Sequence, residues 1–183
     1  MNAVPAIGFI GRSGSGKTTL TVKVIAELCA RGHRVGSIKH HGHKGFDIDV
    51  PGKDSWRQTQ AGSVHTVIAS PDKIATIRQL KHELEFSEIL ATMDDVDIVV
   101  VEGYRHSGIP SIELFRKDNP RDADPANDDE ARIRTALELG DAIGVATDNE
   151  KTAAIALDLG LPVFGLADVS PIVDFIEQRI LPE

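Results

Sequence analysis

Residues 11–18 read Gly-Arg-Ser-Gly-Ser-Gly-Lys-Thr, a full match to the phosphate-binding pattern G-x-x-x-x-G-K-[ST]. A strand-like apolar stretch, residues 6–10, precedes the pattern, and a helix-like stretch, residues 19–30, follows it. The glycines let the backbone approach a phosphate closely, and the N–H groups of the loop and of the helix N-terminus point at the phosphate oxygens. This order of strand, loop and helix predicts a nucleotide-binding P-loop.

The pattern gives individual residues separate roles. Lys17 is expected to reach the β- and γ-phosphates of a nucleotide, and Thr18 to place its hydroxyl on Mg²⁺. The alternative is a Gly/Ser-rich turn without a ligand, which the correct flanking elements disfavour. The residues expected to bind the nucleotide here are Gly11, Arg12, Ser13, Gly14, Ser15, Gly16, Lys17, Thr18 and Thr19.

Length and composition predict a globular protein with one nucleotide-binding domain over residues 1–183. The 20 Lys and Arg against 28 Asp and Glu give a net charge of −8, which argues against nucleic-acid binding. Residues 1–46 nevertheless hold seven basic residues and one acid, which suits an anionic ligand. No apolar run approaches the ~18 residues of a membrane span, no signal peptide is expected, and the lone Cys29 cannot form an internal disulfide. These features predict a cytoplasmic protein that does not bind membranes.

Strands and helices alternate along the chain. Residues 97–101 are an apolar run typical of a strand buried on both faces, whereas the alternation in residues 111–116 predicts a half-exposed strand. The alternation of elements predicts an α/β fold, a mostly parallel sheet flanked by helices, with a β-hairpin extension. Expected strands cover residues 4–10, 34–39, 64–69, 73–80, 97–101, 111–116, 142–147 and 162–165. Expected helices cover residues 17–30, 54–61, 82–93, 131–139 and 169–180.

A P-loop protein also needs an acid at the end of another strand to position Mg²⁺. The apolar run described above ends in Glu102, which is therefore the expected acid and, with Lys17, an expected catalytic residue. The strand of residues 34–39 is expected beside the first strand, and the loop after it holds Asp47 and Asp49. Either aspartate could face the metal, and Asp49 is favoured. The expected metal ligands are Thr18, Asp49 and Glu102.

Several further stretches suggest roles near the same site. Asp148 at a strand end could accept hydrogen bonds from guanine N1–H and N2–H₂, or form an Asp/Asn turn. Residues 40–43 hold three histidines without cysteines or a second cluster, which favours a loop facing phosphate or a partner over a zinc site. Arg105 and His106 are expected near the same mouth. Residues 118–130, with six acids and one Arg, predict a mobile loop.

Five motifs taken together are informative about the family. They are the P-loop extended by Thr19-Leu20, then Ile38-Lys39-His40, Pro51-Gly52-Lys53-Asp54-Ser55, Ala61-Gly62 and Val101-Glu102-Gly103-Tyr104-Arg105-His106. In these motifs residues 5–116 resemble the MobB proteins of molybdopterin-guanine dinucleotide biosynthesis. The resemblance implies a homodimer that binds GTP and hydrolyses it weakly. It also implies that this protein acts as an accessory to the guanylyltransferase that attaches GMP to the molybdopterin cofactor.

Two other function classes also fit a P-loop: a small-molecule kinase, and a non-hydrolysing adaptor whose nucleotide is structural. A kinase usually needs a lid with arginines, whereas residues 118–130 are acidic. Lys17 is an expected transition-state cation, with Arg12 or Arg105 as further ones, but no water-orienting Gln follows a recognisable switch. The sequence therefore predicts slow GTP hydrolysis that a partner stimulates.

Overall fold

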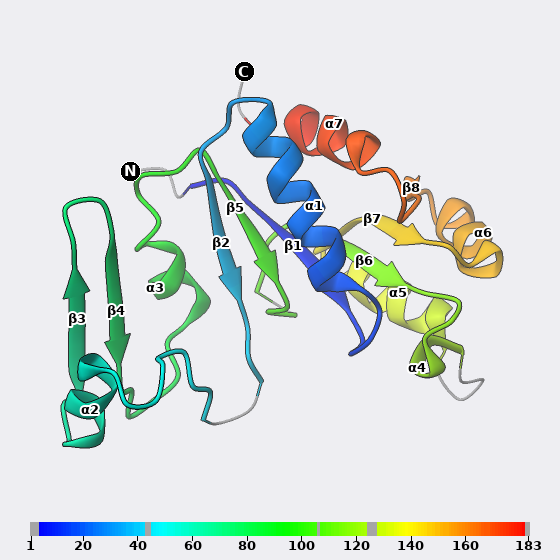
Figure 1. The fold of residues 1–183 in the computed structure, drawn as a ribbon. Coiled ribbons are helices and arrows are strands. Elements are labelled where there is room, and N and C mark those ends of the chain that lie inside the picture. Colours follow the sequence, from blue (N-terminus) through cyan, green and yellow to red (C-terminus); the bar gives the residue numbers. More distant parts are fainter. Residues whose placement is uncertain (1–3, 43–44, 106, 124–127, 182–183) are drawn as a thin grey trace. The chain divides into compact units, whose positions relative to one another are not determined.

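The computed structural model describes residues 4–42, 45–105, 107–123 and 128–181. Within these ranges the chain forms two compact units, Met1–His40 with Phe86–Glu183, and His41–Glu85. The first unit contains a sheet with helices, and the second contains a hairpin with a short helix (Figure 1). No helix in the described ranges is long and apolar enough to cross a membrane. That residues 1–183 make one domain stays a prediction.

A parallel sheet forms the centre of the first unit. Its strands are β1 (Ala6–Gly11), β2 (Val35–Lys39), β5 (Ile98–Glu102), β6 (Ser111–Phe115), β7 (Ala142–Thr147) and β8 (Val163–Phe164). In the described part of the chain these six strands lie in the order β2-β5-β1-β6-β7-β8, and each neighbouring pair is parallel. The carboxyl ends of the strands therefore meet at one edge, where open α/β sheets bind their ligands. The predicted fold class is confirmed.

The strand order differs from the prediction at one position. The predicted neighbour of β1 is β2, and this is wrong, because β5 lies between the two. β5 is apolar and buried from Ile98 to Val101, so it is most stable with a strand on each side. Along β2, by contrast, the exposed Ser37 and Lys39 alternate with the buried Gly36 and Ile38, which suits the edge of the sheet.

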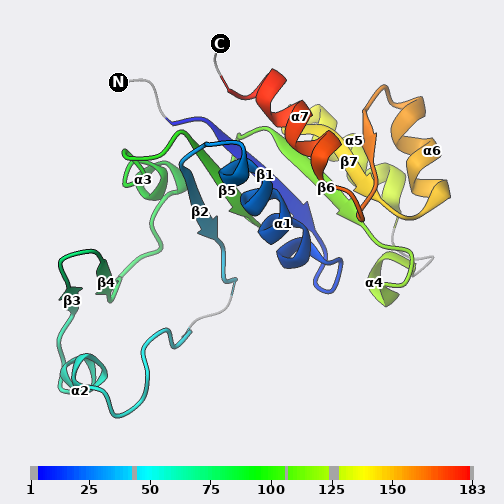
Figure 2. The ribbon, with the colours of Figure 1, turned by 45° about the horizontal axis from the view of Figure 1, so that its top comes forward.

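Helices cover both faces of the sheet. On one face α1 (Lys17–Ala30) and α7 (Ser170–Arg179) pack beside each other, as Figure 2 shows. Leu20, Val24 and Leu28 recur at helical spacing on α1 and are buried against the sheet. The start of α1 is thereby held next to the end of β1, which places the P-loop at the carboxyl edge.

The other face carries α5 (Asp129–Glu138) and α6 (Glu150–Asp158), which pack through Ile133 and Ala156 against β6 and β7. No helix is predicted over the residues of α6. The start signal is nevertheless present in the sequence, since the Asn149 side chain accepts hydrogen bonds from two N–H groups of the first turn. The helix predicted over residues 82–93 is shorter in the structure, α3 (Phe86–Leu90).

The central strand β6 corrects another prediction. A half-exposed strand is wrong for this segment, because all five residues Ser111–Phe115 are buried. β6 lies between β1 and β7. Two successive residues of β6, Leu114 and Phe115, belong to the core clusters on opposite faces of the sheet. The polar residue that creates the alternation, Glu113, is buried and ion-paired rather than exposed to water.

The acidic segment is also more ordered than predicted. A mobile loop over residues 118–130 is wrong for the part that the structure describes, which contains α4 (Pro120–Ala123) and the start of α5. Asn119 and Asp122 are buried within it. Residues 124–127 lie outside the described ranges. Hydrogen bonds and ion pairs, rather than apolar packing, hold the described part in place.

The second unit contains the predicted β-hairpin. β3 (His65–Ala69) and β4 (Ile74–Arg78) pair antiparallel, with Ala69 opposite Ile74 next to the turn. The turn is closed by hydrogen bonds from the Ser70 N–H and hydroxyl. The short helix α2 (Asp54–Gln60) packs against β3. The hairpin extension is thus confirmed.

Candidate nucleotide-binding site

The P-loop joins β1 to α1 and is shaped to hold an anion. Gly14 and Gly16 adopt φ of 85° and 86°, the left-handed region that favours glycine. A Cβ on Gly11 would come within 2.6 Å of the Ser15 Oγ atom, so the loop is tight there as well. The buried Ser15 Oγ atom has no hydrogen-bond partner among the residues that the structure describes. A phosphate oxygen fits this environment, since a buried hydroxyl without a partner costs free energy.

Lys17 lies against the inside of the loop. Its Nζ atom donates hydrogen bonds to the main-chain oxygens of Gly11, at 2.9 Å, and Arg12, at 2.8 Å. Burial lowers the pKa of Lys17, and the nearby Glu102 carboxylate partly opposes this change. The ammonium is therefore positioned at the loop, and its charge is directed to the place where the pattern puts the phosphates.

Thr18, Glu102 and Lys39 form a compact group beside the P-loop. The Thr18 hydroxyl donates to Glu102 Oε1 at 2.9 Å, and the Lys39 Nζ atom lies 3.1 Å from the same carboxylate oxygen and 3.2 Å from the hydroxyl oxygen. Parallel pairing explains the meeting, because Glu102 is the register partner of both Phe9 on β1 and Lys39 on β2. The Lys39 ammonium thus contacts both oxygens that would hold Mg²⁺, the Thr18 hydroxyl and the Glu102 carboxylate. Because these two oxygens already surround a positive charge, they also fit a divalent cation.

The backbone after Glu102 is held in an uncommon conformation. Gly103 has φ of 89°, and a Cβ there would lie 3.1 Å from the His40 Cβ atom. The next residue, Tyr104, also has a positive φ of 57°, which is uncommon for a residue with a side chain. Its ring packs against the rings of His40, at 4.4 Å, and Phe86, at 5.1 Å. These contacts hold the main chain in place where it leaves the sheet, directly after Glu102.

Arg12 and the acidic segment form an ion-pair network behind the P-loop. The Arg12 Nη1 atom lies 3.1 Å from Asp122 and 3.3 Å from Asp129, and the Asn119 amide donates to the main-chain oxygen of Ser13 at 3.3 Å. Burial alone would raise the pKa of Asp122, but hydrogen bonds from Asn119, the Arg116 N–H and Arg12 outweigh it and lower that pKa. The Arg12 side chain therefore braces the loop through carboxylates, while its main chain forms part of the loop.

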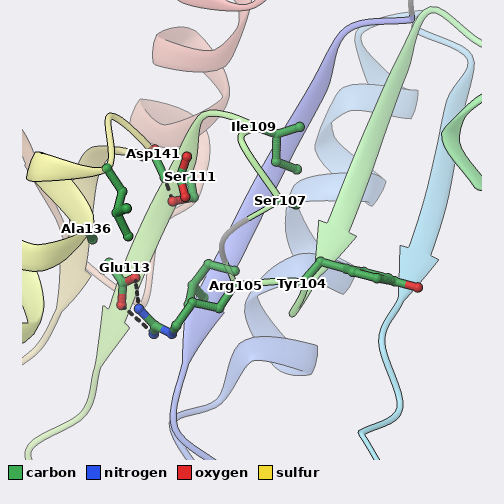
Figure 3. A pocket seen from close by; sticks show the side chains of 10 residues that line it. Tyr104, Arg105, Ser107, Ile109, Ser111, Glu113, Ala136 and Asp141 are labelled. Carbon is green, nitrogen blue, oxygen red and sulfur yellow. Dashed lines mark hydrogen bonds and ion pairs between the residues drawn. The ribbon is translucent and has the colours of Figure 1, made fainter. Parts of the chain in front are cut away.

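Arg105 is likewise committed to a carboxylate. Its guanidinium binds Glu113 with two hydrogen bonds of 2.7 and 3.1 Å, as Figure 3 shows, and Arg132 Nε lies 3.4 Å from the same carboxylate. The cavity beside this pair has a volume of about 10 Å³, room for about one water molecule and not for a nucleotide. An open groove lies next to it, lined by Gly11, Arg12, Arg105, Ala131, Arg132 and Thr135.

Asp148 lies at the carboxyl end of β7, on the opposite side of β1 from Glu102. One of its carboxylate oxygens accepts a hydrogen bond of 2.7 Å from the Lys117 N–H. The next residue, Asn149, caps α6. The Asp148 carboxylate therefore stands at the ligand-binding edge and holds the main chain after β6, while Asn149 makes the local contacts at the start of α6. The contact of Asp148 with a nucleobase stays a prediction.

The remaining predicted residues belong to other environments. Asp49 Oδ1 accepts from the Val50 N–H at 2.8 Å, while its buried Oδ2 has no partner within the described ranges. Asp49 and the exposed Asp47 belong to the unit of residues 41–85, so their assignment to the metal stays a prediction. The His41 ring packs on Phe46, and His43 and His106 lie outside the described residues.

Sequence patterns identified Lys17, Thr18 and Glu102, and the structure brings these three together. Lys39 was missed as a site residue, although it enters the family motif. The signal available in the sequence was its position as the last residue of a strand, the same position that Glu102 has on its own strand. Arg12 and Arg105 do not supply free cations, because carboxylates bind both guanidiniums.

The parallel sheet, the loop between β1 and α1, and the acid at the end of β5 define a P-loop protein of the α/β class. The family model for molybdopterin guanine dinucleotide synthesis protein B, MobB, matches residues 6–136, and the chain belongs to this family.

Individual relatives agree with this assignment. The molybdopterin-guanine dinucleotide biosynthesis adapter protein of Escherichia coli is 35% identical over 179 residues, covering 96% of this chain and 93% of that protein. The Haemophilus influenzae protein of the same name is 40% identical over 119 residues, 64% of this chain and 66% of that one. The crystal structure of Bacillus subtilis MobB superposes with a TM-score of 0.70 at 22% identity, covering 98% and 99% of the two chains, and so shares the fold.

Proposed function

We propose that this protein binds GTP and hydrolyses it weakly as an accessory protein in molybdopterin guanine dinucleotide biosynthesis. The observation that carries the proposal is the group of Lys17, Thr18 and Glu102 at the carboxyl edge of a parallel sheet. Membership of the MobB family and the names of its relatives support the pathway.

Thr18 and Glu102 would hold Mg²⁺, and the assignment of Asp49 to the same ion stays a separate prediction. When bound, the ion neutralises charge on the β- and γ-phosphates. Lys17 would leave its main-chain acceptors and bind those phosphates, while the backbone of residues 11–16 donates N–H groups to them. Asp148 would select guanine, because its carboxylate can accept from N1–H and N2–H₂, which adenine lacks.

The proposed hydrolysis is slow because the site supplies few transition-state contacts. Lys17 is a cation at the loop, but the Arg12 and Arg105 side chains are occupied by carboxylates. Gln58 and Gln60 lie in and at the end of α2, in the other unit. A partner that supplies an arginine would raise the rate, by ~10³–10⁵-fold in known cases. The guanylyltransferase or a second copy of this chain would be that partner.

A homodimer is supported by the hairpin. Val67 and Ile74 lie on one face of the β3–β4 ribbon, and each is more than half exposed. Ile68 on the opposite face is 44% exposed. A two-stranded ribbon is marginally stable by itself in water, so apolar side chains on both faces favour burial against another chain. Sedimentation velocity of the wild type and of Val67→Glu and Ile74→Glu tests this: a monomeric wild type would refute the dimer.

Calorimetric titration of the nucleotide-free protein with GTP, GDP, ATP and ADP, each with and without Mg²⁺, tests the nucleotide proposal. We expect GTP to bind more tightly than ATP and Mg²⁺ to strengthen triphosphate binding. Phosphate release without an added acceptor separates a hydrolase from a small-molecule kinase. Binding without turnover, even with the guanylyltransferase and molybdopterin present, would favour the adaptor whose nucleotide is structural. Absence of binding would refute the proposal.

The proposed location is the cytoplasm.

A further inference from the structure

Arg116 lies beside the P-loop with its guanidinium uncommitted. It directly follows β6, on which Leu114 pairs with Gly11, the first residue of the loop. The Arg116 Nη1 atom lies 3.0 Å from the position that a Cβ on Gly16 would occupy. Its side chain is exposed, and within the described ranges its guanidinium has no hydrogen-bond or ion-pair partner. A full positive charge is thus presented at the start of α1.

The neighbouring arginines have a different role. Arg12, Arg105 and Arg132 each have a carboxylate oxygen within 3.4 Å, so their charges are compensated by the protein itself. Arg116 has a fixed main chain instead: its N–H donates to Asp122 at 3.2 Å. The fixed backbone reduces the entropy that the side chain loses on binding a ligand, and the uncompensated charge favours an anion.

The position of Arg116 indicates which part of a nucleotide it would contact. The group of Thr18, Glu102 and Lys39 lies on the side of β1 that faces β5 and β2. Arg116 comes from β6 on the other side, next to β7, and the adjacent Lys117 N–H binds Asp148. A nucleotide with its terminal phosphates at the first group would have its nucleoside end on the side of Arg116.

We propose that Arg116 binds the α-phosphate of the nucleoside di- or triphosphate held by the P-loop. This inference rests on the proposed nucleotide-binding function. The guanidinium remains charged at any physiological pH and its planar N–H fork matches two phosphate oxygens. Because GDP and GTP share the α-phosphate, the contact contributes equally to the affinity for both, and it does so without Mg²⁺.

The test is calorimetric titration of Arg116→Ala and Arg116→Lys with GDP and with GTP, in EDTA and in Mg²⁺. We expect Arg116→Ala to weaken both nucleotides by about tenfold to a hundredfold, the loss of a charge-assisted contact. The nucleotide affinity of Arg116→Lys should lie between those of Arg116→Ala and the wild type, because lysine keeps the charge but lacks the planar N–H fork. Arg134→Ala is the matched control: it removes another exposed arginine, one paired with Glu130 on α5, and should change affinity less than twofold.

Four results distinguish failure of this inference from failure of the proposed function. Wild-type affinity of Arg116→Ala for both nucleotides, with an unchanged melting temperature, would overturn the inference. A loss for GTP without a loss for GDP would overturn the α-phosphate assignment in favour of a γ-phosphate contact. If the wild-type protein binds neither nucleotide, the proposed function fails and this inference fails with it. If the wild type binds and Lys17→Ala does not, the proposed function stands whatever Arg116→Ala shows.

Discussion

The hydroxyl of Thr18 donates a 2.9 Å hydrogen bond to the carboxylate of Glu102, a residue 84 positions further along the chain. Thr18 lies in the first turn of α1 and Glu102 ends β5, so the bond joins the P-loop to the neighbouring strand of the parallel sheet. The two side chains supply a hydroxyl and a carboxylate oxygen at one point, the type of ligands that Mg²⁺ prefers. Thr18 and Glu102 are therefore the centre of the candidate metal site.

Lys17→Ala should abolish triphosphate binding and leave the fold intact. The ammonium is directed to the phosphates, and its acceptors in the structure are two main-chain oxygens of the loop rather than a core partner. Charge-assisted bonds to phosphate contribute about 1.5–3 kcal/mol each. Calorimetric titration with GTP measures the loss, and far-UV circular dichroism checks the fold. Lys23→Ala, on the exposed side of the same helix, is the control; unchanged GTP affinity in Lys17→Ala would contradict the assignment.

Glu102→Gln and Asp49→Asn should each weaken GTP binding in Mg²⁺ more than in EDTA. Each substitution removes the negative charge and keeps the size of the side chain. It should therefore weaken metal binding while leaving the packing of the side chain nearly unchanged. The ratio of the GTP dissociation constants with and without Mg²⁺ is the measured quantity. An equal loss under both conditions would show that the substituted residue does not serve the metal.

GTP hydrolysis by the purified protein should be slower than about 1 s⁻¹, the low end for dedicated phosphoryl-transfer enzymes. The site presents Lys17 as a cation, while carboxylates occupy Arg12 and Arg105. Phosphate release is measured for the protein alone and with the guanylyltransferase and molybdopterin added. Faster turnover by the protein alone would favour the kinase-like alternative.

Arg105→Ala should destabilise the protein by about 3 kcal/mol, because it leaves the Glu113 carboxylate buried with Arg132 as its remaining cation. Glu113 is 1% exposed in the centre of the sheet, so water cannot replace the lost partner. The double variant Arg105→Leu/Glu113→Leu should recover part of the loss, since it removes the buried charge as well. Urea denaturation of the three proteins measures this. A double variant less stable than Arg105→Ala would contradict the explanation.

The stabilising effect of Asp122 should depend on pH. Its folded-state pKa lies below the ordinary value of 3.8, since hydrogen bonds from Asn119, Arg116 and Arg12 outweigh burial. A lowered carboxyl pKa means that the contribution is present above the unfolded-state pKa and is lost as the pH falls through the folded-state pKa. Asp122→Asn should therefore lower the free energy of unfolding at pH 7 and have much less effect at a pH below the folded-state pKa of Asp122. Equal losses at both pH values would show that packing, not charge, explains the effect.

Local patterns predicted the elements that carry the candidate site. The P-loop follows from glycine spacing, the helix after it from helical periodicity, and the strand that ends in Glu102 from one apolar run. Each of these signals is contained in a short stretch of sequence. Such signals act over short distances, so they are visible without the fold. The parallel sheet follows from the alternation of strands and helices.

Contacts between distant segments were decided by the tertiary structure. β5 lies between β1 and β2, which brings Lys39 to Glu102, and β6 is buried despite its alternating pattern because Arg105 and Arg132 neutralise Glu113. These outcomes depend on which strands become neighbours and on charges that meet only after folding. The sequence by itself determined where a phosphate would bind; the tertiary structure decided which cations lie beside that place and which are already paired, because pairing depends on distances in space that one-dimensional spacing does not contain.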